Sequence, residues 1–249
     1  MHLQAARDLQ RAKFVLFLSV ALFAPNCGHA SVPETVAQAL KRYGIEVNEA
    51  ALVKAMSDPR KEVRGLAAAE LADMKVINAL PEILRAAESE QDGLTQVNIA
   101  AAATWLGSDQ GLSLLKGICA DGSKPGYVRA SAARSVFREQ DHTCFRPLVD
   151  MIDLGTDTEG RIEAIDLLAQ VRPKTDEEEK TALRLALDAL HDPEVMVRLQ
   201  ACEAIRWIGD PKAIAPLQQA LEHEQEKVVR ERIGLVLKLL RENGRQPLE

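Results

Sequence analysis

Asp58-Pro59-Arg60-Lys61-Glu62-Val63-Arg64, followed by the alanine run Ala67-Ala68-Ala69 and by Leu71, is the stretch that decides the fold. The same phrase returns as Asp192-Pro193-Glu194-Val195-Met196-Val197-Arg198. Each copy places an Asp-Pro turn signal in front of apolar residues spaced four apart, which is the spacing of one face of a helix. The chain therefore contains a repeated helical unit.

Four weaker copies lie between and beyond these two. When the Val-Arg pair serves as a marker, the six copies are marked by Val63, Val97, Val128, Gly160, Val197 and Val229, which follow one another at intervals of 31 to 37 residues. A period in this range is typical of helical solenoids, in which each helix pair buries its apolar face only by stacking on its neighbours. The sequence predicts an all-α fold, a right-handed α–α superhelix of about six helix pairs over residues 48–242.

The internal design of a repeat can be predicted from the first copy. We expect Asn48 to cap a first helix that ends near Met56 and a second helix to run from about residue 60 to residue 73, with Pro59 at its first position. We number positions within a repeat from its marker, which is position 0. In the second helix, positions 0, 4 and 8 hold apolar or small residues and should form the buried face.

This pattern resembles the HEAT-repeat family, specifically its short prokaryotic kind, also known from phycobilin (PBS) lyases, over roughly residues 48–241. The resemblance implies that the second helices line the concave face of the solenoid. It also implies a ladder between successive repeats, formed by the turn Asp and the Arg six residues later. Asp58 with Arg64 and Asp192 with Arg198 match the ladder fully, and Glu224 with Arg230 is a conservative version.

The middle of this ladder is imperfect. Asn98 stands in place of the arginine in the second copy, and Ser123 and Gly155 stand in place of the acid in the third and fourth copies. Gly160 also occupies a core position. We therefore expect a flexible or irregular joint at the fourth repeat.

The first 30 residues have the three parts of an export signal. These are the basic residues Arg7, Arg11 and Lys13, an apolar run from Phe14 to Ala24, and the small-residue stretch Gly28-His29-Ala30 before Ser31. An apolar run of this length is shorter than the roughly 20 residues that a membrane-spanning helix needs. We therefore predict that residues 1–30 are a cleavable signal peptide, and that the mature protein is periplasmic or secreted without stable insertion in a membrane.

Cys27 offers a lipoprotein alternative, but Asn26 occupies the place before it, where a lipobox requires a small residue. Residues 31–47 should form an N-terminal capping helix and a linker, and residues 243–249 a flexible tail. The Cys119 and Cys144 side chains differ in repeat position by an amount that corresponds to about 9 Å along neighbouring parallel helices. Bridged cysteines need Cα atoms within about 7 Å, so we expect these two to be small buried side chains without a disulfide.

The formal net charge is −6 at pH 7 and becomes −8 once residues 1–30 are removed, because they contain three basic residues and one acidic residue. Binding to nucleic acid depends on Lys and Arg that neutralise phosphates, so this balance opposes it, and it offers no basic patch for anionic lipids. We expect a monomer that needs no cofactor and whose partner is another protein.

The sequence offers little catalytic chemistry. It has no nucleophile motif, phosphate loop or zinc spacing. The best metal candidates are His191-Asp192 and His223-Glu224, which are equivalent in successive repeats. Deoxyhypusine hydroxylase, a HEAT-repeat enzyme, uses several His-Glu pairs, whereas this chain has one. An enzyme or enzyme-accessory protein, lyase-like or metal-dependent, with a site between repeats is the alternative to a non-catalytic scaffold.

We predict that the chain is an exported scaffold or adaptor that binds another protein through the concave face of its second helices. Candidate binding positions combine both charges with two aromatics, and Arg and Trp are favoured interface anchors. These candidates are Arg134, Phe137, Arg138, Glu163, Asp166, Glu203, Arg206 and Trp207. In the early repeats we expect the same surface to be smaller and more apolar, with Gly65, Ala69, Ile99, Ala103 and Leu106.

Overall fold

A computed structural model describes residues 34–153 and 157–243 of the chain. The predicted signal peptide, its cleavage site and Cys27 lie outside the described residues, as does most of the predicted tail. The α-helices are α2 (Val36–Arg42), α3 (Glu49–Ala55), α4 (Lys61–Asp73), α5 (Leu80–Ser89), α6 (Gly93–Trp105), α7 (Asp109–Ala120), α8 (Gly126–Arg138), α9 (Phe145–Asp153), α10 (Thr158–Gln170), α11 (Asp176–Asp188), α12 (Val195–Ile208), α13 (Ile214–His223) and α14 (Lys227–Asn243). Short 3-10 turns precede α5, follow α11 and precede α13.

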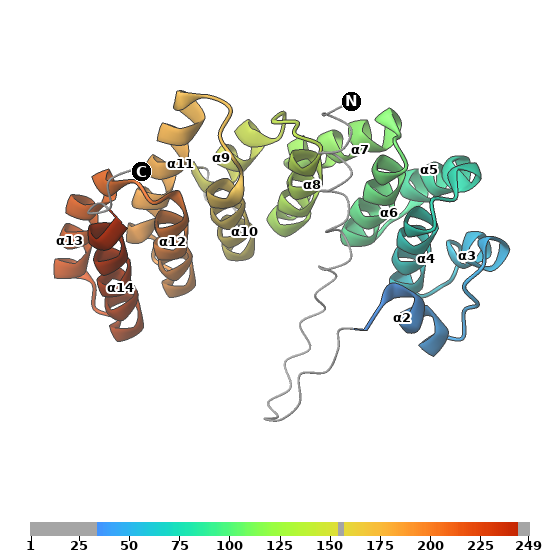
Figure 1. The fold of residues 1–249 in the computed structure, drawn as a ribbon, viewed down its shortest axis with the longest axis horizontal. Helices are drawn as coiled ribbons and strands as arrows, with labels where there is room; N and C mark the ends of the chain where they lie inside the picture. Colours follow the sequence, from blue (N-terminus) through green and yellow to red (C-terminus); the bar gives the residue numbers. More distant parts are fainter. Residues whose placement is uncertain (1–33, 154–156, 244–249) are drawn as a thin grey trace.

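The helices from α3 to α14 form six successive pairs that stack into an arch (Figure 1). The second helices of the pairs, which are α4, α6, α8, α10, α12 and α14, lie side by side along its inner side (Figure 1). The predicted all-α solenoid of six helix pairs is confirmed. Helix α2 packs against α4 at the N-terminal end of the stack.

Local capping chemistry explains where the first pair begins. The Asn48 side chain accepts a hydrogen bond of 2.9 Å from the backbone N–H of Ala51 and caps α3. The residue that precedes α4 is Arg60, so the prediction that Pro59 occupies the first helical position is wrong. Asp58 accepts from the Arg60 N–H at 2.9 Å, and the Asp-Pro pair shapes the turn before the helix instead of its first turn.

The second repeat has a different phase from the one that its sequence suggests. Helix α6 begins two residues before Thr95, just as α4 begins two residues before Val63. Thr95, Ile99 and Ala103 are buried, whereas Ala101 and Trp105, which follow Val97 by four and eight residues, are only partly buried, so Thr95, Ile99 and Ala103 occupy positions 0, 4 and 8. Val97 is therefore not at position 0, although Val97-Asn98 resembles the Val-Arg pair of the other repeats. The marker of the second repeat is Thr95. With Thr95 as the marker, the neighbouring intervals become 32 and 33 residues.

The second helices pack closely because small residues lie where they meet. Ala67, Ala132, Ala164 and Ala201, each at position 4, are completely buried. With apolar residues at positions 0 and 8 they belong to two apolar core clusters, of which one contains Ala67, Ala132 and Ala164 and the other Ala201. Alanine at the centre of this stripe lets adjacent backbones approach without leaving a void.

Two glycines mark the tightest contact between second helices. A Cβ built on Gly160 of α10 would lie 2.7 Å from the Gly126 Cα of α8. Asp157 reinforces this contact, since it accepts hydrogen bonds from the N–H groups of Gly160 at 2.7 Å and Gly126 at 3.0 Å. Gly160 thus has a packing role, and flexibility of this joint stays a prediction.

The expectation that Cys119 and Cys144 are unbridged is wrong. They form a disulfide whose Cα atoms are 6.1 Å apart. The expectation failed because it placed both cysteines on neighbouring parallel helices. Cys119 lies in α7, but Cys144 lies in the connection that precedes α9, so the rise per residue of a helix does not give its level.

Replacing Gly160 by Ala tests the close packing. Although alanine is favoured over glycine in a helix interior by about 1 kcal/mol, the added Cβ should force α8 and α10 apart, so we expect a net loss of about 1–3 kcal/mol in urea unfolding. Gly117→Ala in α7 and Gly234→Ala in α14 are matched controls, because nothing lies within 4 Å of their Cβ positions. We expect both controls to be neutral or stabilising. Equal stability of the Gly160 variant and the controls would contradict the packing role.

Candidate interaction surface on the second helices

Each second helix from α6 to α12 is covered on three sides, by its own first helix and by the second helices before and after it, whereas α14 has no second helix after it among the described residues. The residues left uncovered lie at positions −1, 3, 6 and 10, which fall on one side of a helix. We call these positions the inner stripe. Over the last four repeats it comprises Tyr127, Ser131, Arg134 and Arg138 on α8, Glu159, Glu163, Asp166 and Gln170 on α10, Met196, Gln200, Glu203 and Trp207 on α12, and Val228, Arg232, Leu235 and Leu239 on α14.

Six of the eight residues predicted to bind a partner lie on the inner stripe: Arg134, Arg138, Glu163, Asp166, Glu203 and Trp207. The other two, Phe137 and Arg206, lie at position 9 beside it. Phe137 is half-buried, packs against the core and contacts the His142 ring edge-on at a centroid distance of 5.3 Å. Arg206 extends over the Trp207 ring at 4.8 Å from its centroid.

The predicted early surface is largely wrong. Gly65, Ile99 and Ala103 are buried, because Ile99 and Ala103 belong to the core stripe of the re-phased second repeat. Gly65 lies at position 2 and faces the next second helix. A Cβ built on Gly65 would lie 3.8 Å from side-chain atoms of Asn98 and Thr95. Ala69 is on the inner stripe, and Leu106 is partly buried against the core.

Position 6 of one second helix bonds with position 3 of the next along the C-terminal half of the arch. Arg134 donates to Glu163 at 3.1 Å, and Gln200 donates to Asp166 at 2.9 Å. In the last step Arg232 donates to Glu203. We call this series the inner ladder; it aligns α8, α10, α12 and α14 side by side.

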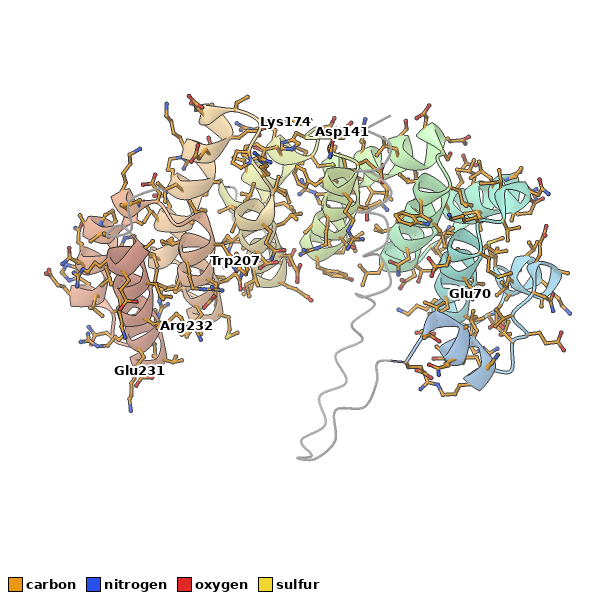
Figure 2. The ribbon with its side chains drawn as sticks, viewed as in Figure 1. Glu70, Asp141, Lys174, Trp207, Glu231 and Arg232 are labelled. Atoms are coloured by element: carbon orange, nitrogen blue, oxygen red, sulfur yellow. A yellow bond between two sulfur atoms is a disulfide. The ribbon has the colours of Figure 1, made fainter. Side chains whose placement is uncertain are left out.

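Glu203 is the member of the inner ladder that is bonded to two arginines. It accepts hydrogen bonds from Arg206, at 2.8 Å, and from Arg232. Burial would raise the pKa of Glu203, but the two guanidinium groups outweigh burial and hold the pKa below its ordinary value. Glu203 is therefore ionised at neutral pH and joins α12 to α14 (Figure 2 labels Arg232 on α14).

A second set of ion pairs, which we call the outer ladder, links the turns of successive repeats. Arg198 forms a fork with Glu224, with N–O distances of 2.8 and 3.1 Å, and also donates to the carbonyl oxygens of Asp192 and Pro193. Arg64 repeats this geometry with Glu90.

The acid of each outer pair comes from the following repeat. Arg161, for example, donates to Asp192 of the next repeat at 3.0 and 3.2 Å. Glu90 stands five residues before Thr95, at the position that Asp58 occupies in the first repeat. With Val97 as the marker, Asp92 would stand at this position, so the sequence prediction missed Glu90. The ladder implied by the family resemblance is therefore present at these three joints.

The outer ladder includes the two carboxylates that the sequence analysis considered as metal ligands. Asp192 and Glu224 are ion-paired with Arg161 and Arg198. Within residues 34–153 and 157–243, no group of three or more His, Cys, Asp and Glu side chains is arranged to hold a metal ion. None of the helices in these ranges is long and apolar enough to cross a membrane.

Exposed apolar side chains gather on the inner stripe. Among the described residues, seven large hydrophobic side chains are exposed, and five of them lie at stripe positions: Leu94, Met196, Trp207, Val228 and Leu235. Met196 and Trp207 are each 61% exposed. Sequence reasoning found only Trp207, although apolar residues at position −1 of α12 and α14 and at position 6 of α14 were a usable signal.

The outer face of the last helix differs from this stripe. On α14, Glu231 and Lys238 occupy positions 2 and 9, where α4 carries the buried small residues Gly65 and Ala72. Both Glu231 and Lys238 are exposed, and Figure 2 labels Glu231 at this end of the arch. This polar face gives a further helix pair no apolar surface on which to stack.

Comparison with known proteins identifies the repeat type. The family model described as HEAT repeats matches residues 49–136 and 145–238. No curated protein sequence matches the chain significantly. Among solved structures, the crystal structure of an engineered protein is similar with a TM-score of 0.47 and 19% identity, covering 77% of this chain and 95% of that one.

Two natural proteins are also among the similar structures. Human deoxyhypusine hydroxylase in complex with glycerol has a TM-score of 0.33 and 18% identity, covering 78% of this chain and 84% of that one. The complex of CpcE and CpcF of phycocyanin lyase from Nostoc sp. has a TM-score of 0.36 and 15% identity, covering 88% and 99%. None of these similarities bears on the function of this chain.

The outer ladder predicts a defined pH dependence. Hydrogen bonds from Arg198 hold the pKa of Glu224 below its ordinary value of 4.5, despite burial. A carboxyl whose pKa is lowered by folding stabilises the protein above its unfolded pKa, and this contribution disappears as the pH falls through the folded pKa. Glu224→Gln should therefore cost about 1–3 kcal/mol at pH 7, and the difference from wild type should vanish progressively below pH 4.5.

Urea unfolding of both proteins between pH 7 and pH 2 measures this difference. Glu222→Gln is a control, because Glu222 is an exposed neighbour on α13. A difference between Glu224→Gln and wild type that does not change with pH would contradict the ion-pair account.

Proposed function

Because the chain belongs to the HEAT-repeat family, we propose that it is an exported, non-catalytic scaffold or adaptor that binds another protein along the inner stripe of α8 to α14. The observation that carries this proposal is the gathering of exposed apolar side chains on that stripe. Four of them, Met196, Trp207, Val228 and Leu235, lie on the adjacent helices α12 and α14.

The physical argument is one of burial. Covering a large apolar side chain is favourable by about 1.5–3 kcal/mol, and a few such anchors dominate the affinity of typical interfaces. Trp207 with Arg206 over its ring joins an aromatic anchor to a cation, the two residue types most enriched among such anchors. The inner ladder keeps this surface in one shape, which lowers the entropy cost of binding.

Charge narrows the class of partner. Along the stripe, the arginines of α8 are followed by the acids Glu159, Glu163 and Asp166 of α10, by Glu203 of α12 with Arg206 beside it, and by Arg232 of α14. Such alternation fits the mixed charges of a protein surface, whereas a phosphate backbone or an anionic lipid surface would favour a uniformly basic one. The polar outer face of α14 supports a monomer that binds through its inner side and not through this end.

Export is supported by the basic start, the apolar run and the small residues before Ser31. In a protein matured outside the cytoplasm, the partner would be an envelope or secreted protein. The mass of the mature protein, expected to begin at Ser31, can be measured on the same sample that is used for the binding experiment below.

Photo-crosslinking tests the proposed surface. A benzophenone amino acid placed at position 207 should capture a discrete partner in native envelope and secreted fractions, because this position lies on the exposed stripe. The matched control is the same amino acid at Ile77, which is 57% exposed but lies in the connection between α4 and α5.

Loss of the anchors gives the second arm of the test. Met196→Ser combined with Val228→Ser should reduce capture at position 207 by at least tenfold, whereas Ile77→Ser should leave it unchanged. Equal capture from positions 77 and 207, or no effect of the stripe substitutions, would show that the partner binds elsewhere.

A further inference from the structure

The outer ladder is interrupted in the middle of the arch. At the joint between the second and third repeats, Gln96 and Ser123 replace the arginine and the acid. At the joint between the third and fourth, Arg129 is present, but the chain has Gly155, which has no carboxylate, at the acid position. Arg129 is buried and donates from Nε to the carbonyl oxygen of Cys119 at 3.1 Å.

A covalent bond lies at the second of these joints. Cys119 is in the last turn of α7, the first helix of the third repeat, and Cys144 directly precedes α9, the first helix of the fourth. Their disulfide therefore joins the same two repeats that lack the ion pair. Both cysteines are at most 1% exposed, so the bond is shielded from solvent and from exchange with other thiols.

The connection from residue 139 to residue 144, which carries Cys144, is held from both sides. On one side, Lys116 of α7 pairs with Asp141 at 2.7 Å. On the other, the His142 Nδ1 lies 3.0 Å from a Glu178 carboxylate oxygen, and the Lys174 Nζ donates to the Gln140 carbonyl. Asp141 and Lys174 lie close together on the outer side of the arch (Figure 2).

We infer that the Cys119–Cys144 disulfide replaces the missing outer-ladder ion pair at the joint between the third and fourth repeats, and that the protein acquires it in an oxidising compartment. The inner ladder crosses the same joint through Arg134 and Glu163, so the tie also fixes how the two halves of the inner stripe face each other. This inference is independent of which partner binds the stripe.

Formation of the bond requires an oxidant, for which a protein disulfide of an oxidoreductase is the chemical class. The thiolate of one cysteine attacks that disulfide and releases one of its thiols, which gives a mixed disulfide. The second cysteine then attacks its partner's sulfur and releases the other thiol. Two protons and two electrons pass to the oxidoreductase, which leaves as a dithiol. Such oxidants operate in compartments outside the reducing cytosol.

Cys202 supplies an internal control. It is a buried free cysteine in α12, and burial raises the pKa of its thiol to about 12, so it resists oxidation. Its distance from the joint in the fold means that replacing it should leave the third and fourth repeats unaffected.

A thiol map and hydrogen exchange test the inference. Cells that produce the full chain are quenched with acid, and the protein is then denatured in N-ethylmaleimide without reductant and mapped by mass spectrometry. We expect a peptide that links Cys119 to Cys144 and an alkylated Cys202. Alkylated Cys119 and Cys144 would overturn the inference.

Exchange is then compared between wild type, Cys119→Ala/Cys144→Ala and the control Cys202→Ala. Loss of the tie should raise exchange in residues 139–153 by at least about tenfold and leave α3 to α5 unchanged. If the double variant does not fold, the folded wild type is measured with and without a phosphine reductant instead. Unchanged protection of residues 139–153 after loss of the bond would contradict the inference.

Discussion

Close stacking of consecutive second helices is the constraint on which the rest of this structure depends. It requires small residues where the helices meet, which is why Ala67, Ala132 and Ala201 are completely buried and why Gly126 faces Gly160. Because each second helix between the two ends is covered on three sides by this stacking, a single stripe remains open to a partner. The position of the candidate interaction surface therefore follows from the packing of the core.

The two ladders and the disulfide hold the stack in register. The outer ladder connects turns through Arg64, Arg161 and Arg198, and the inner ladder connects helices through side chains that also border the exposed apolar residues. Stability of a solenoid is approximately a sum over its joints. At the joint between the third and fourth repeats, where Arg129 meets no acid at the ladder position, we infer that the Cys119–Cys144 bond supplies the missing tie.

Much of the fold could be predicted from the period, the Asp-Pro turns and the alanines. The period gives the length of one helix pair, the turns separate its two helices, and the alanines lie where second helices stack. The phase of the second repeat could not be predicted, since Val97-Asn98 resembles the marker, and only the start of α6 and the burial of Ile99 and Ala103 show that Thr95 is position 0. The disulfide was missed because the prediction placed both cysteines on parallel helices, whereas Cys144 lies in the connection before α9. Most charged members of the candidate surface were predictable from helical position, whereas Met196 and Val228 required knowledge of which residues remain exposed.

Radical footprinting of methionine and tryptophan oxidation tests the central claim most directly, that a partner covers the inner stripe. Met196 on the stripe and Met74 at the end of α4 have the same chemistry, and both are exposed. If the account is correct, oxidation of Met196 and Trp207 is lower in the native envelope or secreted fraction than in the purified protein, while Met74 is oxidised equally in both. Equal oxidation of Met196 in the two samples, or selective protection of Met74, would contradict it.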